Sequence, residues 1–214
     1  MTFMSAKISA ARPQADAMVA LHSLPFDAQT LKRWSVDEYH RMAEAGLLAE
    51  CDRTELLAGQ IILMIAKGTP HVTALRLLAN ALDQALTNQP FFVSTQDPIQ
   101  LDDYSEPEPD LVIVKGDFLD YAAHHPTPQD ICLVVEVADS TLKQDCEVKD
   151  KLYAQAGIND YWVLDLPNRQ LHIFRTPTSM GYTSHLILKQ DQQISPLAFS
   201  DIVLSLEELL PPEL

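Results

Sequence analysis

Two acidic residues lie next to or inside apolar runs where hydrophobic side chains would be expected. Asp110 precedes Leu111-Val-Ile-Val114, and Glu136 lies within Ile131-Cys-Leu-Val-Val-Glu-Val137. An ionised carboxylate in a dry strand is costly unless a partner offsets its charge. Two carboxylates at the ends of adjacent strands can together bind a hard cation that prefers oxygen ligands, such as Mg²⁺ or Mn²⁺. The pair therefore predicts a metal site, although an ordinary salt bridge or a half-exposed strand end is the simpler interpretation of either acid alone.

Lys149 is the third residue that could take part in chemistry. It follows the Glu136 strand on a helix expected from about Lys143 to Ala156, where it shares a face with Asp145 and Tyr153. An ammonium group beside a metal could orient an attacking water or offset charge on a phosphate. A solvated helix face is the alternative, because other lysines lie nearby in the sequence.

Hydrophobic periodicity predicts the scaffold that must position these residues. Ser35-Val-Asp-Glu38 is a capping box, which indicates a helix ending at Gly46. Gly59 suits the turn of a hairpin over residues 54–64, and Pro70 opens a helix from His71 to about Leu86. Strands are expected at residues 91–95, 98–101, 110–114, 131–137, 160–164, 170–174 and 182–188, a surface loop at 116–129, and a short helix at 205–210. This order predicts an α/β (α+β) fold with a mixed β-sheet flanked by helices.

Length and composition favour one domain. The chain has 214 residues, of which 47% are hydrophobic, enough for a sizeable core. Residues 1–29 show no clear periodicity, so we expect a flexible N-terminal arm before a single domain of residues 30–214. No apolar run is long enough for a membrane span. Three widely spaced cysteines without a CxxC pair indicate neither a disulfide framework nor a cysteine zinc site, which favours the cytoplasm.

The charge balance bears on the class of ligand. The formal net charge is −15, from 15 basic and 30 acidic residues. A protein that binds duplex DNA tightly usually carries a basic face that displaces counterions from phosphate. The acidic balance therefore argues against tight, non-specific duplex binding, but not against phosphate chemistry at a metal. His124-His125 has no third ligand at metal-binding spacing, and we assign it no function.

The order and spacing of several short motifs resemble the Uma2 family, formerly DUF820, which is common in cyanobacteria. That family is assigned to the PD-(D/E)XK superfamily of restriction-endonuclease-like proteins. The resemblance extends from about Leu31 to Leu210. The motifs are Pro109-Asp110, Glu136-Val-Ala138, Asp145-xxx-Lys149-xxx-Tyr153-xxx-Gly157, Trp34-Ser-Val-Asp-Glu-Tyr, Glu55-Leu-Leu-Ala-Gly-Gln-Ile, His71, Gln96-Asp-Pro-Ile-Gln-Leu and Tyr161-Trp-Val-Leu-Asp165.

The resemblance implies a role for individual residues. Asp110 matches the aspartate of the PD element, and Glu136 matches the first acid of the (D/E)XK element. Ala138 occupies the position of the usual lysine, which is a departure from the superfamily pattern. This arrangement resembles many Uma2 members, in which a lysine on the following helix takes the place of the missing one. Here that lysine would be Lys149. Glu55 resembles a further acid that could be an outer metal ligand, although a strand-end acid beside a hairpin is an equally good interpretation.

Three more residues are supporting candidates, namely His71, Gln96 and Tyr153. His71 and Tyr153 also have a purely structural interpretation, as a helix-start residue and as a packing residue. Superfamily relatives often form dimers, and exposed aromatics around Tyr161-Trp162 would be compatible with a homodimer, although core packing is an alternative for these rings.

The sequence therefore predicts a Mg²⁺-dependent (or Mn²⁺-dependent) endonuclease that hydrolyses phosphodiester bonds of DNA. Asp110 and Glu136 are expected to bind the metal, and Lys149 to assist the attacking water. The alternative is a catalytically inactive nuclease-fold protein that acts as a binding or assembly module. RNA or a small phosphodiester as the substrate is a third possibility, because a chain of this charge tolerates a ligand best when its phosphate contacts are few.

Overall fold

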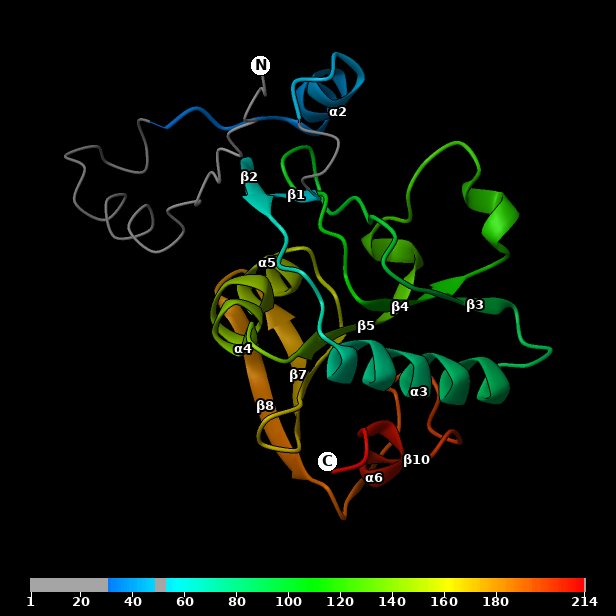
Figure 1. The fold of residues 1–214 in the computed structure, drawn as a ribbon. Coiled ribbons are helices and arrows are strands. Elements are labelled where there is room, and N and C mark those ends of the chain that lie inside the picture. The colour runs from blue at the N-terminus through cyan, green and yellow to red at the C-terminus, as the bar shows by residue number, and fades with distance from the viewer. Residues whose placement is uncertain (1–30, 49–52, 214) are drawn as a thin grey trace, which may run out of the picture. The chain divides into compact units, whose positions relative to one another are not determined.

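The computed structural model describes residues 31–48 and 53–213. The expected arm, residues 1–29, lies outside the described residues, so the predicted domain bounds stay a prediction. The helices and strands belong to the unit that begins at Arg33 (Figure 1). Within the described residues, no helix has both the length and the apolar character needed to cross a membrane.

The first elements form as their capping and turn residues predict. Helix α2 (Val36–Glu44) begins at the Ser35 capping box and is followed by Gly46, which adopts a positive φ of 67°. Strands β1 (Thr54–Leu57) and β2 (Gln60–Leu63) pair antiparallel as the expected hairpin. Gly59 in its turn has φ 81°, a conformation that glycine adopts without strain.

A six-stranded mixed sheet forms the centre of the fold, with the strand order β3-β4-β5-β6-β7-β8. Strands β5 and β6 run parallel, and the other neighbouring pairs run antiparallel. The strands are β3 (Phe91–Ser94), β4 (Leu111–Lys115), β5 (Ile131–Ala138), β6 (Asp160–Asp165), β7 (Gln170–Thr178) and β8 (Gly181–Lys189). Two short strands, β9 (Gln193–Ile194) and β10 (Leu204–Ser205), pair with each other. The predicted fold class is confirmed.

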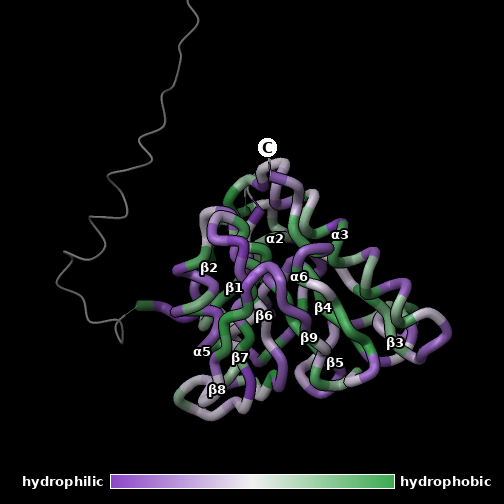
Figure 2. Tube along the Cα trace, turned by 90° about the horizontal axis from the view of Figure 1, so that it is seen from below, coloured by the Kyte–Doolittle hydropathy of each residue, from purple (hydrophilic) through white to green (hydrophobic). Residues whose placement is uncertain are grey.

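Helices cover both faces of this sheet. Helices α3 (Thr69–Ala85) and α6 (Leu206–Leu209) pack with alternate residues of the central strands, including Leu133, Val135 and Val137. The residues between these, such as Val134 and Ala138, pack on the other face with α5 (Asp150–Gln155). Because both faces are covered, β4 is hydrophobic from Leu111 to Val114 (green in Figure 2).

The chain between β5 and β6 differs from the single helix expected at residues 143–156. It consists of α4 (Leu142–Gln144), the π-helical turn η4 (Asp145–Lys149) and α5. The amide of Asp150 donates to the carbonyl of Asp145, five residues earlier. Gly157 ends the segment with φ 82°, as expected. Short π-helical turns occur often at functional sites.

Two further expectations were wrong. Residues 98–101 do not form a strand, because Pro98 has no amide to donate and the amides of Ile99 and Leu101 bond to the loop carbonyls of Pro107 and Ser105. The rings of Tyr161 and Trp162 are fully buried in the two cores and offer no exposed aromatic surface. The predicted loop at 116–129 contains the 3₁₀ turn η2 (Phe118–Tyr121) and the start of η3 (Pro128–Asp130).

Candidate active site

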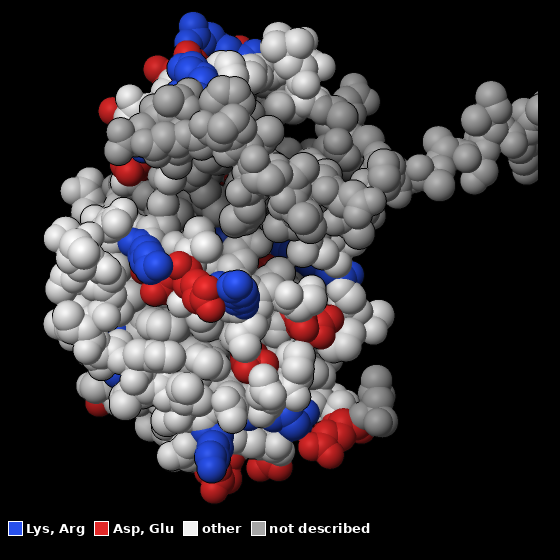
Figure 3. Space-filling view, turned by 90° about the vertical axis from the view of Figure 1, so that its left-hand side faces the viewer, with Lys and Arg blue, Asp and Glu red and all other residues white. Residues whose placement is uncertain are grey.

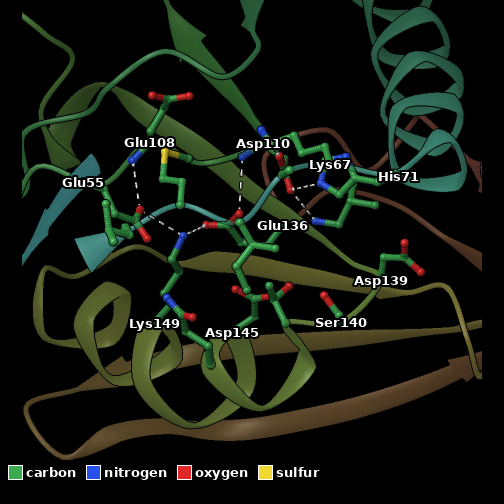
Figure 4. Close-up of a pocket in the computed structure, with 18 residues that line it drawn as sticks. Glu55, Lys67, His71, Glu108, Asp110, Glu136, Asp139, Ser140, Asp145 and Lys149 are labelled. Atoms are coloured by element: carbon green, nitrogen blue, oxygen red, sulfur yellow. Dashed lines mark hydrogen bonds and ion pairs between the residues drawn. The ribbon is translucent and has the colours of Figure 1, made fainter. Parts of the chain in front are cut away.

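Asp110 and Glu136 meet because β4 and β5 are antiparallel neighbours. Leu111 pairs with Val135, so Asp110 lies opposite Glu136 where β4 would continue. The amide of Asp110 donates to Glu136 Oε2 at 3.3 Å, and the amide of Val137 donates to Asp110 Oδ2 at 2.9 Å. Both side chains are buried. The two acids therefore share one place at the end of the sheet (Figure 4).

Cationic and polar donors surround the Asp110 carboxylate. Lys67 Nζ lies 3.0 Å from Oδ1, and His71 Nε2 lies 2.9 Å from Oδ2. Burial alone would raise the pKa of Asp110, but the hydrogen bond and charge of His71, the charge of Lys67 and the Val137 amide lower it to about 2. Asp110 is therefore ionised at neutral pH and available to bind a cation.

Glu136 has the opposite electrostatic balance. Its Oε1 accepts hydrogen bonds from Lys149 Nζ and Tyr153 OH, each at 3.0 Å. Burial raises the pKa of Glu136, the ammonium of Lys149 opposes this, and the neighbouring carboxylates add to it, so that the pKa reaches about 8. Burial and the surrounding acids thus favour the protonated form of Glu136, and the ammonium of Lys149 offsets this only in part.

Lys149 lies between two carboxylates. It ends the π-helical turn η4, and its Nζ is 3.0 Å from Glu136 Oε1 and 3.1 Å from Glu55 Oε2. Burial would lower the pKa of Lys149, but the surrounding carboxylates, led by Glu136 and Glu55, raise it. Lys149 is therefore a charged donor, and it does not act as a base at neutral pH.

Two further buried acids complete the cluster. Glu55, on β1, accepts from the amide of Glu108 at 3.3 Å in addition to its contact with Lys149. Asp145, at the start of η4, accepts from Thr141 Oγ1 at 2.6 Å. Burial raises the pKa of Asp145 to about 6 against the lowering effects of Lys149 and Thr141. Three carboxylates, those of Glu136, Glu55 and Asp145, thus act on the single ammonium of Lys149.

These side chains line an open cavity of about 80 Å³, which has room for a cation with several waters. Carboxylate oxygens dominate its charged groups, and such oxygens are the ligands that Mg²⁺ and Mn²⁺ prefer. Lys67 Nζ, on the side chain that contacts Asp110 Oδ1, occupies the kind of position that a cation would take. The charged and ionisable residues of the lining are Glu55, Lys67, His71, Glu108, Asp110, Glu136, Asp139, Asp145 and Lys149.

The structure brings most of the predicted site residues together. The residues Asp110, Glu136, Lys149, Glu55 and His71 all line the cavity, and the Tyr153 hydroxyl donates to Glu136 Oε1. Gln96 is not among the lining residues. Its backbone amide donates to the carbonyl of Asp110 at 3.2 Å, so it contacts the site residue through the backbone.

Nothing in the sequence indicated a role for Lys67, and Asp145 was predicted only to share a helix face and a motif with Lys149. Lys67 lies in an irregular segment between β2 and α3, where a lysine has no distinguishing pattern. The spacing of four residues between Asp145 and Lys149 could have indicated that Asp145 belongs to the site, because such residues share a helix face.

The fold is of the restriction-endonuclease-like type. A protein from Anabaena variabilis, described as "a putative nuclease belonging to DUF820", has a similar structure with a TM-score of 0.63. The two chains are 15% identical, and the similarity covers 82% of this chain and 96% of the other.

The family follows from the sequence. Residues 36–207 match the model of the Uma2 family, whose description is "Putative restriction endonuclease". The chain belongs to the Uma2 family, and this membership supports a nuclease role. None of the curated proteins matches the sequence.

Proposed function

We propose that the cavity is a Mg²⁺-dependent phosphodiesterase centre, also able to use Mn²⁺, and that the protein is an endonuclease acting on DNA. The observation that carries the proposal is the meeting of Asp110 and Glu136 in a cavity whose charged groups are mainly carboxylates. Asp110 and Glu136 are the proposed metal ligands. When bound, the ion would polarise the phosphodiester and lower the pKa of a water.

The metal ligands are held by their neighbours. His71 and the Val137 amide fix Asp110 Oδ2, and Tyr153 fixes Glu136 Oε1. The contact of Lys67 with Asp110 Oδ1 is the one that a metal would have to displace, and this side chain is 16% exposed. Glu136 Oε2 accepts one long bond, so it keeps lone-pair capacity for an ion.

Lys149 is the proposed assisting residue. Because its pKa is raised, the amine stays protonated and can donate to the attacking water or to a phosphate oxygen. Glu55 has a double role in this proposal. It holds Lys149 Nζ at 3.1 Å, and it is an additional oxygen that could serve as an outer metal ligand.

The test is cleavage of supercoiled plasmid DNA by the purified full chain with Mg²⁺, with Mn²⁺, and with a chelator. We expect metal-dependent nicking that Asp110→Asn and Glu136→Gln abolish and Lys149→Met reduces by at least about a hundredfold. Asp139→Asn is the matched control, since it changes an exposed acid of the same cavity to which no role is assigned. Full activity in both the Asp110 and Glu136 variants would remove the proposed mechanism.

A second candidate function is a catalytically inactive binding or assembly module. Ala138 in the usual lysine position and the net charge of −15 favour it. On the face drawn in Figure 3, basic side chains lie in separate groups with acidic ones beside them, unlike a continuous basic stripe. Calorimetry without any Asp110-dependent Mg²⁺ or Mn²⁺ binding would favour this function. Parallel assays on RNA and a small phosphodiester would separate the other substrates.

We also propose a homodimer and a cytoplasmic location. The dimer proposal rests only on the frequent dimerisation of superfamily relatives. Tyr161 and Trp162 are buried and supply no interface. The location rests on Cys132 and Cys146, which are free thiols as a reducing compartment would leave them. Light scattering on the purified chain gives the oligomeric state, and a monomer would end the dimer proposal.

A further inference from the structure

A second group of metal-ligating side chains lies outside the cavity. His40, Glu106 and His125 each offer one ligand atom, and these atoms lie within 4.8 Å of one another. His40 Nε2 is 2.7 Å from Glu106 Oε1. The rings of His40 and His125 have a T-shaped arrangement, with their centroids 6.4 Å apart. The three residues are far apart in the sequence, so the fold alone brings them together.

The backbone holds each of the three segments in place. Glu106 exchanges two backbone hydrogen bonds with Leu56 of β1, at 2.8 and 3.2 Å. His40 lies on α2, whose first amide, that of Val36, donates to the carbonyl of Asp103 at 2.9 Å. The loop of His125 is tied through Pro126, whose carbonyl accepts from the amide of Gln100. The ligands are thus positioned by hydrogen bonds that do not involve their own side chains.

The second carboxylate oxygen of Glu106 points to a ligand. Glu106 is 5% exposed, and its Oε2 is buried with no hydrogen-bond partner. A buried polar atom without a partner is unfavourable, because it has lost its hydrogen bonds to water and gained none in the protein. An ion pair with His40 through Oε1 leaves that cost in place. A cation that binds the carboxylate and both imidazoles would remove it.

We propose that His40, Glu106 and His125 form a Zn²⁺ site. The ion would join α2, the segment around Glu106 that bonds to β1, and the loop between η2 and η3. Two imidazoles and one carboxylate are a ligand set that Zn²⁺ uses with a water in the fourth position. Tetrahedral ligand atoms around Zn²⁺ lie roughly 3.3 Å apart. Binding would therefore lengthen the 2.7 Å contact of His40 with Glu106 slightly and bring the more widely separated ligand atoms closer together. Imidazole ligands disfavour Mg²⁺, which separates this site from the acidic cavity.

The site has a structural consequence for the cavity. Glu106 begins the short segment that ends at Asp110, and Pro107 and Pro109 stiffen it. A bound ion would fix the start of this segment and would attach α2 and the His125 loop to it. The site does not depend on the proposed nuclease function, because none of its ligands lines the cavity.

The test is a Zn²⁺ titration of the metal-free full chain against a chromophoric chelator, in wild type and in an Asp110→Asn/Glu136→Gln background that lacks the cavity ligands. We expect one Zn²⁺ per chain that persists in that background and raises the unfolding temperature. His40→Ala and His125→Ala should each weaken binding at least about tenfold. His124→Ala is the matched control, because this exposed neighbour is outside the cluster, and it should bind like wild type.

Co²⁺ in place of Zn²⁺ gives a second readout, since its visible absorption reports imidazole coordination. We expect that signal in wild type and His124→Ala, and its loss in His40→Ala and His125→Ala. Absence of Zn²⁺ binding in wild type would show a hydrogen-bonded pair only and overturn the proposal. Binding that is unchanged in both histidine variants would overturn it as well.

Discussion

Replacing Glu136 by Gln should change how the stability of the metal-free protein depends on pH. Burial and the acids around it raise the pKa of Glu136 from its ordinary 4.5 to about 8, even with Lys149 beside it. A carboxyl whose pKa is higher in the folded state stabilises the fold fully below the unfolded pKa, and this contribution is lost as pH rises through the folded pKa. Each pH unit in the interval removes about 1.4 kcal/mol.

Between about pH 5.5 and 7.5, the wild type should therefore lose about 3 kcal/mol of unfolding free energy relative to Glu136→Gln. The glutamine keeps an oxygen that can accept from Lys149 and Tyr153, so the comparison isolates the ionisation. Urea unfolding in a chelator at several pH values measures the difference, with Asp139→Asn as a control that should follow the wild type. Mg²⁺ should reduce the loss, because a cation favours ionised Glu136. Parallel pH profiles of wild type and the glutamine variant would refute the electrostatic argument.

Three other predictions concern Asp110, Tyr153 and the turn between β1 and β2. The pKa of Asp110 is lowered from 3.8 to about 2, so the wild type should lose about 2 kcal/mol of unfolding free energy as pH falls from about 5 to 2. Acid unfolding of Asp110→Asn should lack this loss. An equal loss in the variant would show that the Asp110 carboxylate is not stabilised in the fold. Tyr153→Phe removes a buried donor to Glu136 while Lys149 still donates, and denaturant unfolding should show a cost of about 1 kcal/mol with the metal dependence retained. Gly59→Ala would place a Cβ 2.8 Å from the Cβ of Arg33, at a φ of +81° that disfavours alanine. Thermal unfolding should therefore show a loss of about 1–3 kcal/mol of unfolding free energy. Unchanged stability would show that the turn relaxes freely.

The elements with strong local signals could be predicted from the sequence. The Ser35 capping box, the Gly59 turn and the Gly157 helix end appear where their residue types require them. The acids inside apolar runs also indicated a site, because their cost in a dry strand is a property of each residue and its neighbours. Their meeting depended on strand pairing, which the family resemblance supplied and local periodicity did not.

The features that sequence reasoning missed depend on long-range contacts. The π-helical turn Asp145–Lys149 has no local pattern, and it places Lys149 Nζ between two carboxylates that come from β1 and β5. His125 lies near two other possible metal ligands, His40 of α2 and Glu106, and His124 is not part of this group. No spacing rule connects residues 40, 106 and 125.

If Asp110 and Glu136 hold one divalent cation between them, anomalous diffraction from crystals of the full chain soaked in Mn²⁺, with no nucleic acid present, will locate it. We predict one peak in the acidic cavity within about 2.3 Å of an oxygen from each of the two acids, with Lys67 moved away from Asp110 Oδ1. Mn²⁺ bound to one acid alone, or an absence of density between the two carboxylates, would show that the two acids do not share a cation.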